Sequence, residues 1–136
     1  MNKSRYTPQN SVLEKFEELT LMTSIGPIFQ SQEGVLSFHP KSDLEITEEG
    51  VLDFLSVIAE SVPCRPLIYH HTIPHSISFE GIQTLLNTGL LNSMAILVNE
   101  GVNAAAARTF LAVGSQFPVR IFEEVEDAYD WSGHFT

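Results

Sequence analysis

Three histidines lie within six residues of one another, at His70, His71 and His75. Imidazoles are common metal ligands and the side chains that change charge near neutral pH. His70 and His71 are adjacent, so a strand would point them to opposite faces of its sheet. The prolyl bond between Ile73 and Pro74 disfavours the helix that would align His71 with His75. We therefore predict no metal site and no cofactor, and we interpret His71 and His75 as part of a contact loop.

The other residues with chemical potential form no recognisable catalytic arrangement. Cys64 lies beside Arg65, but no motif pairs this thiol with a base. The sequence contains no nucleophile elbow, no dinucleotide-binding glycine turn and no phosphate-binding loop. His39 and His134 are isolated along the chain and suggest no site. We therefore predict a protein that is not an enzyme.

The second half of the chain alternates short apolar runs with helical segments. The apolar runs are residues 66–69, 94–98 and 117–122, and the helical segments are residues 79–87, 102–113 and 123–131. Strands that alternate with helices are typical of βαβ units on a parallel sheet. Pro118 has no amide donor, so the last strand should begin late or lie at an edge.

The first half of the chain predicts an antiparallel addition to this sheet. Residues 28–39 have the pattern of a hairpin that turns at Gly34, and Gly26-Pro27 looks like a breaker after a strand at 19–23. Thr47 then caps a helix whose buried stripe is Val51, Phe54, Leu55, Ile58 and Val62. The predicted fold class is α/β: a mixed sheet of about five strands, an N-terminal hairpin followed by β-α-β-α-β-α, with helices packed on it.

The helix at 102–113 is apolar on nearly all sides. Its small residues favour close packing, either on the sheet or against another subunit. We therefore predict a homo-oligomer, a dimer or higher, and a protein partner is a further expectation. The candidate interface residues are Ala105, Arg108, Thr109 and Leu111.

Size and charge narrow the class of protein. The 136 residues suggest a flexible tail at 1–15 and a single domain at 16–136. Seven basic and seventeen acidic residues give a net charge of −10, which repels phosphate backbones and anionic lipid. We predict neither a nucleic-acid nor a membrane partner. The single cysteine forms no intramolecular disulfide, which fits a cytoplasmic location.

Several local phrases resemble small bacterial proteins of the STAS, or SpoIIAA-like, fold, a group that includes anti-sigma-factor antagonists. The phrases are QEGVL at 32–36, PLIY at 66–69, AILV at 95–98, ARTFL at 107–111, FPVRIF at 117–122 and AYDW at 128–131. They cover roughly residues 19–132 and are mostly packing signatures. The resemblance therefore implies the fold more than the function.

STAS antagonists carry a phosphorylated Ser or Thr at the start of the helix that follows a central strand. The matching stretch here runs from Ile77 to Gly81, and the register places Glu80 at the phosphorylated position. Glu80 would then imitate a permanently phosphorylated state, and Ser76 or Ser78 would be modified if the register shifts. The alternative is an ordinary helix start, with Ser78 as N-cap and Glu80 in the first turn. The predicted switch or contact loop is His71, His75, Ser76, Ser78 and Glu80.

Two functions from different classes follow. The first is a non-catalytic interaction or regulatory module of STAS type that self-associates. The alternative is a small-molecule-binding protein that uses the loop after the 66–69 strand, because open α/β sheets bind ligands beyond the carboxyl ends of their strands.

Overall fold

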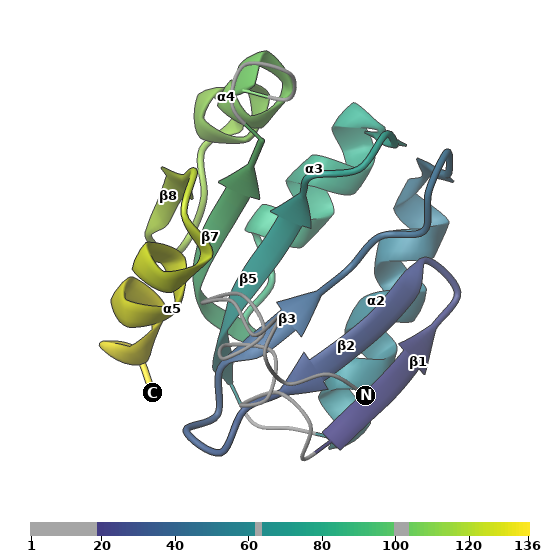
Figure 1. Cartoon of the computed structure of the whole chain (residues 1–136). Helices are drawn as coiled ribbons and strands as arrows, with labels where there is room; N and C mark the ends of the chain where they lie inside the picture. The colour runs from purple at the N-terminus through teal and green to yellow at the C-terminus, as the bar shows by residue number, and fades with distance from the viewer. Residues whose placement is uncertain (1–18, 62–63, 100–103) are drawn as a thin grey trace, which may run out of the picture.

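The computed structural model describes residues 19–61, 64–99 and 104–136 as an α/β fold around a mixed sheet of six strands (Figure 1). The strand order is β1-β2-β3-β5-β7-β8. A separate small sheet pairs β4 with β6 in parallel. The strands are β1 (Leu19–Thr23), β2 (Gly26–Gln30), β3 (Leu36–Phe38), β4 (Glu45–Ile46), β5 (Arg65–His71), β6 (Ser76–Ile77), β7 (Leu91–Val98) and β8 (Val119–Phe122). The predicted fold class is confirmed.

The antiparallel part of the sheet contains β1, β2 and β3. Gly26 and Pro27 lie inside β2, opposite Thr23 and Met22, so the prediction that they break the chain between two strand pieces is wrong. Gly26 adopts φ +144°, and a Cβ on it would lie 2.2 Å from the carbonyl oxygen of His39. Glycine at position 26 therefore allows β2 to start directly after the turn. The sheet has six strands, whereas about five were predicted.

The parallel part contains β3, β5, β7 and β8. β5 and β7 lie at its centre and are paired from Arg65 and Leu91 to His71 and Val98. β8 begins at Val119, directly after Pro118, and forms an edge of the sheet. Both expectations for the last strand are confirmed, because a residue without an amide donor is tolerated just outside the ladder.

Helices cover both faces of the sheet (Figure 1). The helices are α2 (Glu48–Ser61), α3 (Phe79–Leu86), α4 (Ala104–Val113) and α5 (Val125–Gly133). The main core joins buried residues of α2, α3 and α4 to one face, and α5 packs on the other through Ala128 and Tyr129. Four members of the predicted α2 stripe are buried, namely Val51, Phe54, Leu55 and Ile58.

Some predictions fall outside the described residues. They are the tail at 1–15, the side chain of Val62, and residues 102–103 of the predicted alanine-rich helix, of which α4 is the described part. No helix in the described ranges is long and apolar enough to cross a membrane.

Candidate functional site

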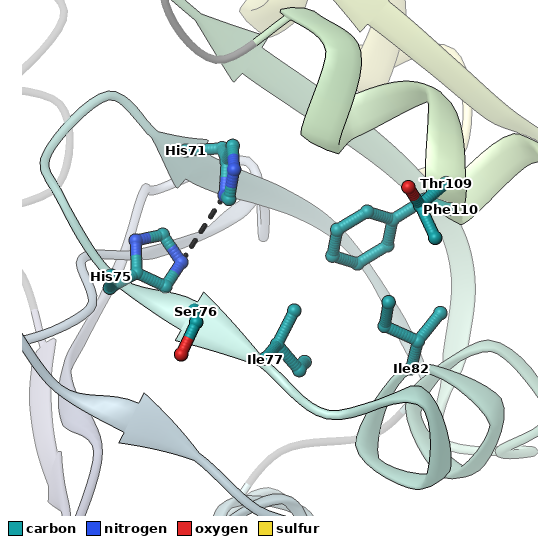
Figure 2. A pocket seen from close by; sticks show the side chains of 7 residues that line it. All are labelled: His71, His75, Ser76, Ile77, Ile82, Thr109 and Phe110. Atoms are coloured by element: carbon teal, nitrogen blue, oxygen red, sulfur yellow. Dashed lines mark hydrogen bonds between the residues drawn. The ribbon is translucent and has the colours of Figure 1, made fainter.

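A cavity of about 170 Å³ lies beyond the carboxyl end of β5 (Figure 2). Elements far apart in the sequence build it: β5, β6, the first turns of α3, and α4. Its lining residues are His71, His75, Ser76, Ile77, Ile82, Thr109 and Phe110. This is the edge of the sheet where α/β proteins bind ligands.

The small β4–β6 sheet places the loop that returns from β5 to the cavity. The amide of Asp43 donates to the carbonyl of Pro74 at 2.6 Å, and the amide of Ser76 donates to the carbonyl of Leu44 at 3.0 Å. The side-chain amide of Asn99 donates to the carbonyl of Thr72 at 2.5 Å. These bonds fix both sides of the loop, so the ring of His75 folds back towards β5.

The imidazoles of His71 and His75 meet at one wall of the cavity (Figure 2). His71 Nδ1 lies 3.2 Å from His75 Nε2, and the Tyr69 hydroxyl lies 2.8 Å from the same nitrogen. His75 Nδ1 lies 2.9 Å from the carbonyl oxygen of Ile73. A carbonyl accepts only, so Nδ1 carries the proton of neutral His75 and Nε2 holds the lone pair. The Tyr69 hydroxyl and His71 Nδ1 then both donate to that lone pair.

Burial keeps this wall uncharged at neutral pH. Desolvation, followed by repulsion from His75, lowers the pKa of His71 to about 4. Burial also lowers the pKa of His75, against a smaller opposing effect of the Ile73 carbonyl. Burial raises the pKa of the Tyr69 phenol above its usual value. The cavity therefore offers neutral hydrogen-bonding groups rather than a fixed charge.

The rest of the lining is mainly apolar. Phe110 contacts Tyr69 edge-on, with ring centroids 5.3 Å apart. Ile77 and Ile82 line the side of the cavity across from His71 (Figure 2). A water molecule occupies about 30 Å³ in the liquid, and a dry apolar cavity of about 150 Å³ holds benzene. The space therefore suits either a few waters or one molecule the size of a single ring.

The cavity brings together four of the predicted site residues: His71, His75, Ser76 and Thr109. The prediction treated helical spacing as the main route by which His71 and His75 could meet. The structure brings them together without a helix, through the turn that joins β5 to β6.

Ser78 and Glu80 lie at the start of α3 and do not line the cavity. The amide of Gly81 donates to the Ser78 hydroxyl at 3.0 Å, so Ser78 is the N-cap of this helix. Glu80 is exposed in the first turn. This geometry is that of the helix-start alternative, and phosphorylation of Ser76 or Ser78 stays a prediction.

The predicted interface residues lie on α4. Arg108 and Leu111 are exposed, and Leu111 exposes 48% of its surface. Thr109 is exposed at the rim of the cavity. Ala105 belongs to the helix, but its side chain is outside the described residues.

A second histidine cluster lies on the opposite face of the sheet, and the sequence reasoning missed it. The Ser37 hydroxyl lies 2.7 Å from His70 Nε2 and 3.2 Å from His39 Nε2. The interpretation of His39 as isolated is therefore wrong. The available signal was the alternation of Ser37 and His39 on one strand, which points both to the same face.

Known proteins offer a likeness in fold. No protein-family model and no curated protein matches this chain. Among solved structures it is similar to an uncharacterized protein of the DUF3478 family with a SpoIIAA-like fold, from Shewanella loihica PV-4. The two share 15% identity with a TM-score of 0.45, over 84% of this chain and 90% of the other. This neighbour has the fold that the sequence resemblance implied. The likeness concerns the fold alone.

Proposed function

We propose that this chain is a non-catalytic binding module that holds one small, largely apolar molecule in the cavity beyond β5. The observation that supports this function is the composition of the lining. Ile77, Ile82 and Phe110 supply apolar surface, and the two imidazoles supply one neutral polar wall. A few polar groups in an apolar recess are typical of small-molecule sites.

The size and charge of the cavity define the ligand class. About 170 Å³ is below the roughly 300–1,000 Å³ of sites for drug-sized ligands. The occupant is therefore at most a single ring or a short branched chain. One hydroxyl or carbonyl group on it would face His71 and His75, or the hydroxyl of Thr109 at the rim.

The proposal of a non-catalytic role rests on what surrounds the imidazoles. Histidine acts as a base in hydrolases when a carboxylate orients it and a nucleophile adjoins it. Here His75 is oriented by a backbone carbonyl, and its Nε2 faces Tyr69 and His71. Among the described lining residues there is no carboxylate and no thiol.

The test is binding of small probes to the purified chain, with phenol, benzyl alcohol and cyclohexanol measured by ligand-observed NMR. Thr109→Trp places a large ring at the rim and should abolish binding. Arg108→Trp is the matched control, because Arg108 is the exposed neighbour on the same helix and does not line the cavity. Absence of binding by all three probes, or equal binding by the Thr109→Trp variant, would overturn the proposal.

A second candidate function is self-association through α4, as the STAS resemblance suggests. The supporting observation is Leu111, a large apolar side chain that is 48% exposed beside the exposed Arg108. α4 also supplies Phe110 to the cavity, so a bound molecule would contact the helix that presents this surface. A regulatory module would use that connection to link ligand and partner.

Sedimentation velocity over a wide concentration range tests this second function. The unmodified chain should form a discrete dimer or higher oligomer, and Leu111→Glu should return it to monomer. Ala112→Glu is the control for added charge, since Ala112 is exposed on the same helix. A monomer at all concentrations would remove the proposal.

A further inference from the structure

Two hydrogen-bond donors share the single lone pair of His75 Nε2. Its partner atoms are Tyr69 Oη at 2.8 Å and His71 Nδ1 at 3.2 Å. The orientation of the ring is fixed, because its Nδ1–H donates to the carbonyl of Ile73 at 2.9 Å. Two imidazole nitrogens and one phenol oxygen thus lie close together beside the cavity. A cation among them would accept electron pairs from all three.

We propose that His71 Nδ1 and His75 Nε2 bind one divalent ion of the late first transition series, such as Zn²⁺ or Cu²⁺, with Tyr69 Oη as a further donor. This proposal departs from the prediction made from spacing, which was that the loop holds no metal site. Imidazole nitrogen is a preferred ligand of these ions, whereas Mg²⁺ and Ca²⁺ prefer oxygen.

The distance between the two nitrogens fits a shared metal ion. Zn–N bonds are about 2.0–2.1 Å long, so two nitrogens 3.2 Å apart subtend an angle of about 100° at the metal. That value is close to the tetrahedral angle. The ion would replace the hydrogen bond that joins the two rings. The remaining coordination positions would face the cavity, which has room for water.

The surroundings of His75 are those of a metal ligand. A metal-binding histidine almost always donates its other ring N–H to a carbonyl or carboxylate, which fixes the ring and its tautomer. The Ile73 carbonyl already does this for His75. With its ring proton on Nε2, His71 would present the lone pair of Nδ1 to the ion, and neutral imidazoles bind a metal ion without a net loss of protons.

Charge also favours an ion here. The chain has a net charge of −10, which attracts cations over long distances. In the described residues no three His, Cys, Asp or Glu side chains form a metal-binding group, so we expect an open site of moderate affinity rather than a closed structural one.

The experiment is calorimetric titration of the chelator-treated chain with Zn²⁺, with no organic molecule present. We expect one ion per chain with a dissociation constant below about 100 µM. His71→Gln and His75→Gln should each weaken binding at least tenfold. His134→Gln is the matched control, because His134 is exposed and does not line the cavity. Circular dichroism establishes that each variant is folded.

A second measurement does not depend on any variant. Long-range ¹H–¹⁵N spectra of the histidine rings should show that Zn²⁺ shifts His71 Nδ1 and His75 Nε2 and leaves the ring of His70 unchanged. No binding by the unmodified chain, unchanged affinity in His75→Gln, or shifts confined to other histidines would overturn the site. Probe binding in the presence of chelator tests the proposed function separately, so either proposal can fail without the other.

Discussion

His39 and His70 stack face to face, with ring centroids 3.8 Å apart and planes inclined by 24°. His39 directly follows β3 and His70 belongs to β5, and these two strands are parallel neighbours. Both rings turn Nε2 towards the hydroxyl of Ser37, so that hydroxyl donates to one ring and accepts from the other. Phe29 meets the edge of His39 at 5.2 Å. Protonation of both imidazoles would place two like charges in this buried stack.

Acid should therefore destabilise the fold through this pair. Burial, with repulsion from His39, lowers the pKa of His70 to about 3, and burial lowers the pKa of His39. Both are lowered below the unfolded value of about 6.5, so the unfolded chain binds more protons at acidic pH. The free energy of unfolding should fall as pH drops from about 6.5 towards 3, by up to about 1.4 kcal/mol per pH unit through His70, and His39 should add to the fall below about pH 6.5.

Urea unfolding at several pH values measures this slope. His70→Gln should flatten the profile between pH 6.5 and 4, even if it lowers stability at every pH. His134→Gln should leave the profile unchanged, since that side chain is exposed. Profiles that run parallel in the unmodified chain and His70→Gln would contradict the prediction.

Gly26→Ala should be among the most damaging substitutions in the sheet. The residue sits at φ +144°, and a Cβ would lie 2.2 Å from a backbone carbonyl oxygen, which cannot move without breaking β2 away from its neighbour. We expect a loss of about 3 kcal/mol or more from strain and displacement together. Gly89→Ala is the control, because a Cβ there meets nothing within 4 Å. Thermal unfolding of the two variants should differ by many degrees.

The sequence was a good guide where one periodicity decided the outcome. The α2 stripe from Val51 to Ile58 and the edge position of β8 after Pro118 follow from local spacing and from a missing amide. The prediction at Gly26 failed because glycine can end a strand but can also begin one directly after a tight turn. The close approach of the His39 carbonyl decides between the two, and this is a tertiary contact that local sequence does not contain.

The candidate site was predictable in part for the same reason. His71, His75 and Ser76 share one loop, so the sequence could group them. Phe110 comes from α4 and Ile82 from α3, and only the packing of both helices on the sheet brings them to His71. The contact between His71 and His75 depends on backbone bonds from the β4 region to the returning loop, which no spacing rule within that loop contains.

Tyr69→Phe should destabilise the chain by about 1 kcal/mol, the usual net value of one hydrogen bond. The ring would keep its packing against Phe38 and Phe110, so little apolar contact is lost. His75 Nε2 would keep one donor, His71, and so would not be left unpaired. Equilibrium unfolding in urea checks the value, and a loss above about 3 kcal/mol would mean that the hydroxyl does more than this single bond.

Ser78→Ala should cost about 1 kcal/mol, because the amide of Gly81 loses its acceptor at the start of α3. Ser78→Asp should retain most of the stability, since a carboxylate both caps the helix and interacts favourably with its dipole. Ser76→Ala is the matched control: Ser76 is exposed, lies two residues earlier and caps no helix. Urea unfolding of the three variants should rank Ser78→Ala lowest. A stable Ser78→Ala with a destabilised Ser78→Asp would show that this hydroxyl is not a cap, and would return attention to its modification.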